Sequence, residues 1–373
     1  MKIKVAALVF VFLVVPLTPA NSIINGTPAV GSDYVVTMLF GDEKTSSHCT
    51  GAYLRPRIVV TAAHCVIRQG ARAPELTRPI QDWYVSQPGI DWLASDTKST
   101  KVKVLKIWTD PDYFNRWEPD KGLRETQVND IAFLFLESEL NGPTISRAAN
   151  REEIESFRSG QGRAFHLGYG CIGESWEKRK PNDGRPYISS EMIGTNMGSL
   201  STPIWDRFLF AQYPVKAEVC SGDSGSPLLM KKGSEVLYLA TIFAGGNGAA
   251  GERYAATTVL WPFVPALDEA YKQFLIEDAK NRELKAKQEA EAKTAAELKA
   301  KQEAEVAATK AALDLKAKQE AEAKVAAELK AKQDAEAKAA ATKKTNIICV
   351  KGKLTKKVTA VKPKCPSGYK LNK

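Results

Sequence analysis

The composition of this chain changes abruptly near residue 270, and the change limits where a packed core can form. All seven Trp lie before that point, whereas the stretch that follows, up to about residue 340, contains almost only Ala, Lys, Glu and Gln. Such a stretch has too few apolar side chains to bury a core of its own. We therefore expect one globular domain that ends near residue 275, followed by an extension with a different kind of structure.

The first 22 residues have the layout of an export signal. Lys2 and Lys4 give a positive start, residues 5–15 form an unbroken apolar run, and small residues follow Pro16. This run is too short to span a bilayer, although a buried strand or a membrane anchor is the alternative interpretation. Because no other stretch approaches eighteen apolar residues, we expect a secreted protein, extracellular or associated with the cell surface, that is not transmembrane after signal removal.

Residues 30–265 have the short apolar runs of an all-β domain. Runs such as 101–108, 131–136 and 236–243 are separated by clusters of Gly, Pro, Asp and Asn, which suits a barrel or a sandwich. Lys and Val alternate over residues 101–104, which predicts a strand with one solvated face. Residues 131–136 are apolar throughout, which predicts a strand that is buried on both faces.

The periodicity of the apolar residues becomes helical from about Pro265. Leu267, Tyr271, Phe274 and Leu275 recur at spacings of three and four residues. This pattern predicts a helix that packs on the barrel through that stripe.

A charged repeat replaces the apolar stripe over residues 276–344. Four copies of ELKAKQEAEAK, or of a close variant, follow one another at intervals of fourteen, seventeen and fourteen residues. An acid precedes a Lys by four residues within each copy, and each such pair stabilises a helix by about 0.2 to 0.5 kcal/mol. We expect a solvated, freestanding helix. A coiled coil is the alternative, but the Gln and Glu at alternate core positions and the seventeen-residue interval disfavour it.

Residues 345–373 form a basic tail. Ten Lys and no acid lie between Lys343 and Lys373, and they account for the formal net charge of +10. Cys349 and Cys365 bracket an alternation of Lys and β-branched residues, which predicts a small disulfide-closed β-hairpin. The tail resembles basic terminal modules of some bacterial exported proteins. Its charge favours an anionic cell-surface polymer as a partner, with no specific nucleic acid, and a soluble end cap is the alternative.

Three segments contain the residue types that activate a serine nucleophile. His64 lies in VVTAAHC, Asp130 in NDIAFLFLE and Ser224 in CSGDSGSPLL. A serine hydroxyl is a poor nucleophile at neutral pH, so it needs an imidazole to take its proton and a carboxylate to orient that imidazole. The order His, Asp, Ser differs from the orders in subtilisin-like and α/β-hydrolase enzymes. The remaining His48 and His166 lack such a setting, and we expect both to be structural.

At these segments the chain resembles the chymotrypsin- and trypsin-like serine proteases, from residue 23 to about residue 275. The resemblance implies two six-stranded antiparallel barrels with an active site between them. It also implies a serine endopeptidase without cofactor or metal, of a bacterial type with a C-terminal helical extension, acting on protein or peptide substrates. A catalytically inactive binding protein with the protease fold, docked to an anionic surface, is the alternative. A structural spacer protein built around the long helix is a third possibility.

The resemblance assigns roles residue by residue. His64 is the base, Asp130 the orienting carboxylate and Ser224 the nucleophile. The backbone N–H groups of Gly222 and Ser224 form the oxyanion hole.

The resemblance also implies an activation step. The segment IINGTPA, which begins at Ile23, matches the N-terminus that such enzymes expose, and its amine pairs with Asp223. A single cut after Ser22 would combine export and activation, whereas a cut after Ala20 would require later trimming.

The expected specificity pocket is centred on Glu218. This residue lies six before Ser224, where trypsin-like members have the acid at the pocket floor, so it implies a preference for Lys or Arg unless it faces solvent. We expect Gly246 in the pocket wall with Gly245, and Tyr254 is a candidate to fill the pocket.

Two residues depart from the family pattern. Ala244 replaces a Ser that usually supports the triad carboxylate, and Ser226 replaces a Gly.

The six Cys fit an oxidising compartment and allow fifteen pairings. The resemblance implies a bridge beside His64, and the expected position of Cys171 near the loop of Cys220 favours a second bridge. The expected pairs are Cys49 with Cys65, Cys171 with Cys220, and Cys349 with Cys365.

Overall fold

The structure is a computed structural model, and it falls into two compact units that divide between Ala279 and Lys280. The expected export signal, residues 1–22, and both of its candidate cleavage sites lie outside the described residues. The structure describes residues 23–40, 45–68, 75–94, 101–115, 129–173, 175, 177–195, 206–213, 217–247 and 252–372.

Six strands of the first unit close into a barrel in the order β2-β3-β4-β7-β6-β5. The apolar strand β7 is buried on both faces as predicted: Leu134 and Leu136 pack inside the barrel, whereas Phe133 and Phe135 pack outside it against the second sheet. The strands are β2 (Val35–Phe40), β3 (Thr45–Arg55), β4 (Ile58–Thr61), β5 (Trp83–Val85), β6 (Val102–Thr109) and β7 (Ala132–Leu136).

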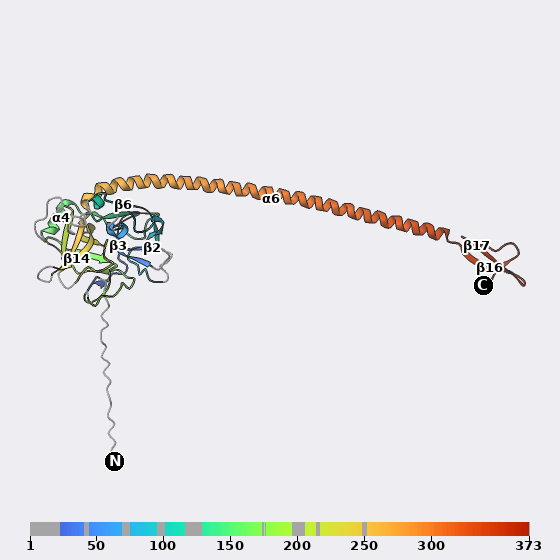
Figure 1. Ribbon diagram of the computed structural model, residues 1–373, viewed down its shortest axis with the longest axis horizontal. Coiled ribbons are helices and arrows are strands. Elements are labelled where there is room, and N and C mark those ends of the chain that lie inside the picture. The colour runs from blue at the N-terminus through green and yellow to red at the C-terminus, as the bar shows by residue number, and fades with distance from the viewer. Residues whose placement is uncertain are drawn as a thin grey trace, which may run out of the picture. The chain divides into compact units, whose positions relative to one another are not determined.

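The second sheet of this unit, which contains β14 (Figure 1), has the strand order β1-β10-β9-β13-β14-β15-β12-β11, with β8 paired to β14. A second closed barrel is therefore not confirmed. Where this sheet would close into a barrel, Ala164 of β9 and Met192 form an isolated bridge. Among the described residues, this bridge is not part of a continuous ladder. The strands are β1 (Thr27–Pro28), β8 (Arg147–Ala148), β9 (Ala164–Gly168), β10 (Tyr187–Ile188), β11 (Ile193–Thr195), β12 (Phe208–Tyr213), β13 (Pro227–Lys232), β14 (Glu235–Asn247) and β15 (Arg253–Val259).

The long helix α6 begins on the barrel. Leu267 and Phe274 are buried, and the Tyr271 hydroxyl donates a hydrogen bond to the Pro56 carbonyl at 3.2 Å. Leu275, which we expected in the same stripe, is 41 % exposed, because the contact face of the helix is narrower than the stripe. The helices are α1 (Ala63–Val66), η1 (Ile80–Asp82), α2 (Asp112–Asn115), α4 (Arg151–Arg158), η3 (Trp261–Phe263) and α6 (Val264–Thr342).

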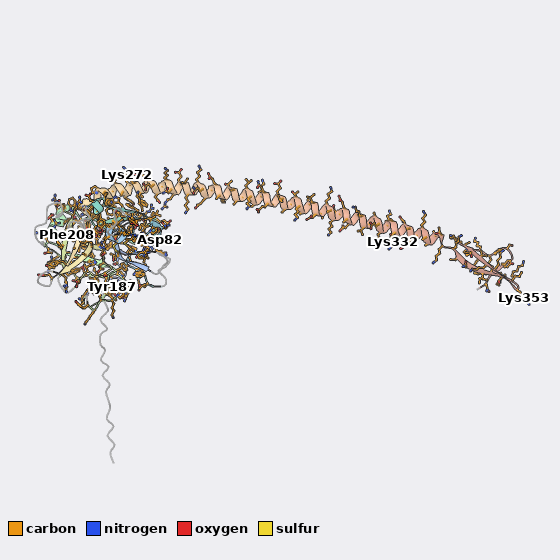
Figure 2. The ribbon with its side chains drawn as sticks, viewed as in Figure 1. Asp82, Tyr187, Phe208, Lys272, Lys332 and Lys353 are labelled. Carbon is orange, nitrogen blue, oxygen red and sulfur yellow. A yellow bond between two sulfur atoms is a disulfide. The ribbon has the colours of Figure 1, made fainter. Side chains whose placement is uncertain are left out.

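The second unit consists of the remainder of α6 and a small sheet. Every side chain from Ala279 to Thr342 is exposed, and Figure 2 shows such side chains, including Lys332, standing out around the helix. At about 1.5 Å per residue this stretch extends over roughly 95 Å. It forms a helix, as predicted; whether it pairs with another copy stays open. Among the described residues, no helix has an apolar stretch that could cross a membrane.

The tail contains the predicted hairpin and one further strand. β16 (Thr345–Lys351) pairs with β17 (Leu354–Ala360) and, on its other edge, with β18 (Lys370–Leu371). The disulfide between Cys349 and Cys365 closes this sheet, and Cys349 is fully buried.

Candidate active site

The barrel brings His64 and Asp130 together through the register of two neighbouring strands. β4 and β7 pair with Thr61 opposite Ala132, so the turn into α1 lies beside the residues that precede β7. The His64 ring Nδ1 lies 2.6 Å from Asp130 Oδ2, and the His64 backbone N–H donates to Asp130 Oδ1 at 2.8 Å. The carboxylate therefore holds both the ring and the backbone of the histidine.

This contact sets the tautomer of His64. A carboxylate only accepts hydrogen bonds, so Nδ1 carries the proton, and in the neutral ring Nε2 is left as an acceptor. Burial lowers the pKa of His64, but the charge of Asp130 and its hydrogen bond outweigh that effect and raise the pKa above its ordinary value. Asp130 is 2 % exposed, and the His64 side chain keeps 19 % of its surface in contact with solvent. The imidazole is thus a strengthened base that a substrate can reach.

Ser224 lies in a turn that packs against the same barrel. The Thr50 backbone N–H donates to the Ser224 carbonyl at 2.8 Å. Cys65 Sγ lies 3.7 Å from that carbonyl and 3.9 Å from His64 Nε2. Within the described residues no hydrogen bond joins the Ser224 hydroxyl to the imidazole, a bond that in substrate-free enzymes often forms only on binding.

Glycines shape the turn around Ser224. Gly222 and Gly225 have φ values of 104° and 85°, in the left-handed region that disfavours side chains. A Cβ on Gly225 would lie 2.1 Å from the Thr50 carbonyl oxygen, so only glycine lets the turn approach the barrel this closely. In the described part of the chain, the backbone N–H groups of Gly222 and Ser224 donate no hydrogen bond. Both donors are therefore available to an oxygen atom of a bound ligand.

Comparison with known protein families agrees with this fold. The sequence profile of the family described as Trypsin matches residues 23–267, which is more than half of the chain. The chain belongs to the trypsin family.

Two relatives match the trypsin-like domain. Phenoloxidase-activating factor 1 of Holotrichia diomphalia is 22 % identical over 239 residues, which cover 61 % of this chain and 63 % of the relative. Ovochymase of Halocynthia roretzi is 24 % identical over 261 residues, which cover 64 % of this chain and 14 % of the relative. The chain thus spans less than two thirds of either relative. Both matches are to animal proteins, so they give no support to the bacterial type expected from the sequence.

In the trypsin-like domain the segment after Ile23 lies against the loop that leads to Ser224. The Ile24 N–H donates to the Glu218 carbonyl at 3.1 Å, and the Glu218 N–H donates back to Ile24 at 3.3 Å. Ile23 is fully buried. In the uncut chain its nitrogen is a peptide amide, so it carries no charge that could pair with Asp223.

Asp223 is buried without a full counter-charge. Its two carboxylate oxygens accept hydrogen bonds from the Gly170 and Cys220 N–H groups, each at 2.9 Å. Burial nevertheless raises the pKa of Asp223 to about 7. In the uncut trypsin-like domain, the Asp223 carboxyl group is therefore mostly protonated and uncharged below about pH 7.

The structure places His166 beside Asp223, an arrangement that the sequence did not indicate. His166 Nε2 lies 3.7 Å from Asp223 Oδ1, and its Nδ1 lies 2.8 Å from the Tyr213 hydroxyl. Among the described residues, the buried His166 Nε2 and Ser226 Oγ have no hydrogen-bond partner. Burial lowers the pKa of His166 to about 3. No local motif could have shown this contact, because it depends on the pairing of β9 with β13.

This pair predicts opposite pH responses in two single variants of the uncut chain. With His166→Gln, only Asp223 remains, and its raised pKa means that stability falls as pH rises from about 4 to about 7. With Asp223→Asn, only His166 remains, and its lowered pKa means that stability falls as pH drops from about 6.5 to about 3. Between pH 4 and 6.5, folding of the parent chain makes Asp223 bind a proton and makes His166 release one. The two effects on the pH dependence of stability therefore offset each other.

The measurement is the free energy of unfolding in urea at half-unit steps from pH 4 to 6.5. We expect the slope of the free energy of unfolding against pH to have opposite signs in the two variants. Each slope should approach the value for one bound proton, and the profile of the parent should be flatter. Slopes of the same sign in both variants would contradict the assignment of these two pKa values.

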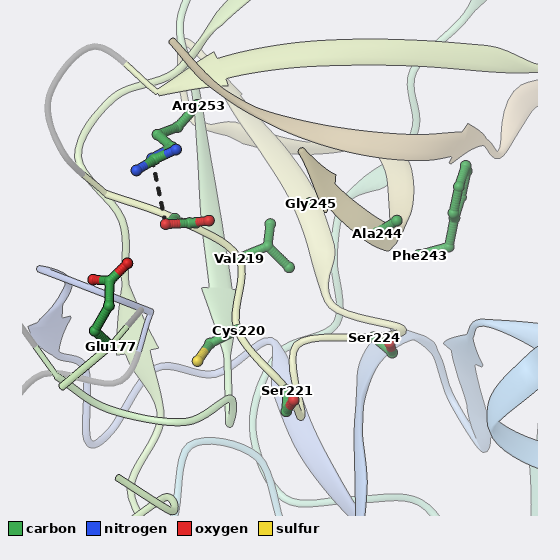
Figure 3. A pocket seen from close by; sticks show the side chains of 10 residues that line it. Glu177, Val219, Cys220, Ser221, Ser224, Phe243, Ala244, Gly245 and Arg253 are labelled. Atoms are coloured by element: carbon green, nitrogen blue, oxygen red, sulfur yellow. Dashed lines mark ion pairs between the residues drawn. The ribbon is translucent and has the colours of Figure 1, made fainter. Parts of the chain in front are cut away.

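A cavity of about 360 Å³ opens beside Ser224 in the trypsin-like domain (Figure 3). Glu218 lines it and is only 14 % exposed, so its side chain does not point into solvent. Gly245 lines the cavity, whereas Gly246, the glycine we expected there, is not among the lining residues. Tyr254 pairs with Gly246 in the ladder and is likewise not part of the lining.

The Glu218 carboxylate is not free in this cavity. Its Oε2 lies 3.4 Å from the Nε of Arg253, a contact that Figure 3 shows as a dashed line. The expected acid is therefore already paired with a cation from this chain, which sequence reasoning missed because Arg253 is 35 residues further along.

The disulfides of the trypsin-like domain brace the two sides of the site. Cys49 bridges to Cys65, next to His64, and Cys171 bridges to Cys220, next to the turn of Ser224. Both pairings are the ones expected from the sequence.

Two residues depart from the family pattern. Ala244 lines the cavity, and Ser226 has the unpartnered hydroxyl described above. The side chain of His48 lies outside the described residues.

Proposed function

We propose that this chain is a secreted serine endopeptidase that hydrolyses peptide bonds through an acyl-enzyme intermediate. The proposal rests on the two hydrogen bonds between Asp130 and His64, one to the ring and one to the backbone N–H. Beside them lies a turn, shaped by glycines, that contains Ser224 and two free N–H donors. Neither a binding protein nor a spacer needs an oriented imidazole at such a turn. Membership of the trypsin family supports the same reaction class.

In the acylation step, His64 Nε2 takes the proton of the Ser224 hydroxyl while Oγ attacks the substrate carbonyl carbon. The carbonyl oxygen becomes an oxyanion, and the N–H groups of Gly222 and Ser224 stabilise its charge. The Asp130 carboxylate stabilises the imidazolium. When the C–N bond breaks, the imidazolium gives its proton to the departing amine, and the acyl group stays on Ser224.

In the deacylation step, His64 takes a proton from water as the water oxygen attacks the ester carbon. The bond to Ser224 Oγ breaks, the serine recovers its proton from the imidazolium, and the acid product leaves. The raised pKa of His64 supports both proton transfers, because it makes the neutral ring a stronger base.

Activation would follow a cut before Ile23. The new ammonium group would supply the counter-charge that the buried Asp223 lacks, and so lower its pKa and order the loop that holds Gly222 and Ser224. The position of Ile24 against Glu218 supports this step, because it brings the new terminus to that loop. N-terminal sequencing of the purified active form tests it, since an active form that begins at Asn21 is incompatible with it.

The basic tail would tether the enzyme to an anionic cell-surface polymer. The exposed Lys residues of β16, β17 and the following loop support this role. Deletion of residues 345–373 is expected to release the protein from cells, and added polyanion or salt is expected to release the full chain. Full-chain binding that resists both treatments would contradict attachment through charge.

A fluorophosphonate probe tests the proposed reaction. In this reagent the serine oxygen displaces fluoride and forms a bond to phosphorus, so labelling requires an activated serine. We expect mass spectrometry to locate the label on Ser224, and casein hydrolysis to fall in step with labelling. Denatured protein, the matched control, should not react. Folded chain that begins at Ile23, hydrolyses no protein and takes up no label would favour the inactive binding protein instead.

A further inference from the structure

The ion pair between Glu218 and Arg253 is built into the fold of the cavity beside Ser224. Glu218 is fixed by its two backbone hydrogen bonds with Ile24. Arg253 begins β15 and is paired in the sheet with Asn247 on one side and with Tyr213 on the other. Both partners are therefore held by backbone contacts, and their side chains meet at 3.4 Å while 14 % and 34 % exposed.

Within this ion pair the two charges of the cavity wall cancel. Glu218 and Arg253 contribute one charge of each sign. The remaining acid in the lining, Glu177, is exposed, so solvent and salt screen its charge. Phe243 and Val219 give the wall an apolar part. A cavity of this kind offers a packing surface to an uncharged side chain, and the one further carboxylate of its described lining, that of Glu177, is exposed to solvent.

We propose that Arg253 is a specificity-determining residue that makes this protease cleave after uncharged side chains and disfavour Lys and Arg at that position. The inference rests on the proposed function and replaces the basic preference expected from Glu218 alone. A Lys or Arg side chain that entered the cavity would lose its hydration beside a like charge, and the one buried carboxylate among the described lining residues would already be paired. Arg253 thus acts as the repulsive element that such discrimination needs.

The first experiment compares peptide substrates that differ only in the residue before the cleaved bond: Leu, Phe, Gln, Lys or Arg. For the parent enzyme, we expect kcat/KM to be at least about tenfold higher for the best uncharged residue than for Lys or Arg. With Arg253→Gln, the ratio of basic to uncharged substrates is expected to rise by about 10- to 100-fold, the gain of one charge-assisted hydrogen bond to the freed Glu218. Adding Glu218→Gln to this variant should abolish the gain.

Arg163→Gln provides a matched control. Arg163 is exposed and donates to the Gly160 and Gly162 carbonyls, outside the lining of the cavity, so the same substitution should leave the ratio unchanged. Arg253→Lys keeps the positive charge and is expected to keep the discrimination. Loss of discrimination in Arg253→Lys as large as in Arg253→Gln would show that the charge is not what decides it.

A second experiment measures the same property without catalysis. Benzamidine, an aromatic amidinium, is titrated by calorimetry into the full chain and into the same variants. We expect Arg253→Gln to bind it about 10- to 100-fold more tightly than the parent does, and the double variant to lose that gain.

The outcomes separate this inference from the proposed function. A parent enzyme that prefers Lys or Arg, or an Arg253→Gln variant whose substrate ratio and benzamidine affinity do not change, would overturn the inference while fluorophosphonate labelling upholds the protease. If no peptide is cleaved and no label is taken up, the proposed function fails, and the benzamidine titration still decides whether Arg253 controls the charge preference of the cavity.

Discussion

Replacing Ser224 with alanine is expected to lower kcat for peptide hydrolysis by about 10⁶-fold. Alanine has no oxygen to form the acyl-enzyme, so His64 and the N–H donors at Gly222 and residue 224 can act only on water. The turn itself should survive, because its shape depends on the glycines and on the Thr50 contact to the backbone of residue 224. The measurement is the release of a fluorophore from an uncharged peptide substrate by chain that begins at Ile23.

Ser226→Ala is the control for this experiment. Ser226 lies in the same turn, and its buried hydroxyl has no partner among the described residues, so its loss should change kcat by less than about tenfold. A Ser224→Ala protein that keeps more than a thousandth of the parent activity would contradict Ser224 as the nucleophile. Equal losses in both variants would point to damage of the turn instead.

Replacing Asp130 with asparagine is expected to lower kcat by about 10⁴-fold. The asparagine amide can donate to His64 Nδ1, which would leave the ring proton on Nε2, the nitrogen that must accept the proton of Ser224. The 2.6 Å contact between Asp130 and the ring makes this exchange of tautomers the direct consequence of the change. Steady-state kinetics over pH 5 to 9 gives both kcat and the pH profile.

The same variant is expected to move the acidic limb of the profile to lower pH. Activity requires neutral His64, so it rises as pH passes the pKa of His64, which lies above its ordinary value in the parent. Without the charge of Asp130, burial alone acts on the ring and lowers that pKa. Asp206→Asn removes a partly exposed carboxylate that pairs with Arg151 and not with His64, so it should change neither kcat nor the limb. A limb that stays in place in Asp130→Asn would contradict the assigned pair.

The sequence predicted the contact between His64 and Asp130 better than it predicted the cavity. Each of His64, Asp130 and Ser224 sits in a segment whose local chemistry already restricts its role, and the structure brings His64 and Asp130 into contact. Glu218 lines the cavity beside Ser224. Its partner Arg253 was not foreseen, because a strand-to-loop contact leaves no trace in the residues around either member. The basic preference inferred from Glu218 alone therefore gave way to a different proposal.

In the fold, too, some features could be predicted from the local sequence and others depended on tertiary contacts. The apolar run of residues 131–136 determined a strand buried on both faces, and the change of composition near residue 270 determined where packed structure gives way to an exposed helix. Both follow from local apolar content, which burial requires wherever the segment lies. The exposure of Leu275 did not follow, because the width of a helix contact depends on the surface beneath it.

By itself, then, the sequence indicated a β-rich domain followed by an exposed helix, and its resemblance to a known family indicated disulfide partners that the structure contains. Only the tertiary structure decided that Arg253 neutralises Glu218 and that His166 lies beside Asp223. It also decided that the second sheet is joined across its opening only by an isolated bridge between Ala164 and Met192 among the described residues. Composition and spacing act over a few residues, whereas these contacts depend on the register of strands that are distant in the chain. A shift of one residue in the register of β15 or of β9 would turn Arg253 or His166 to the opposite face.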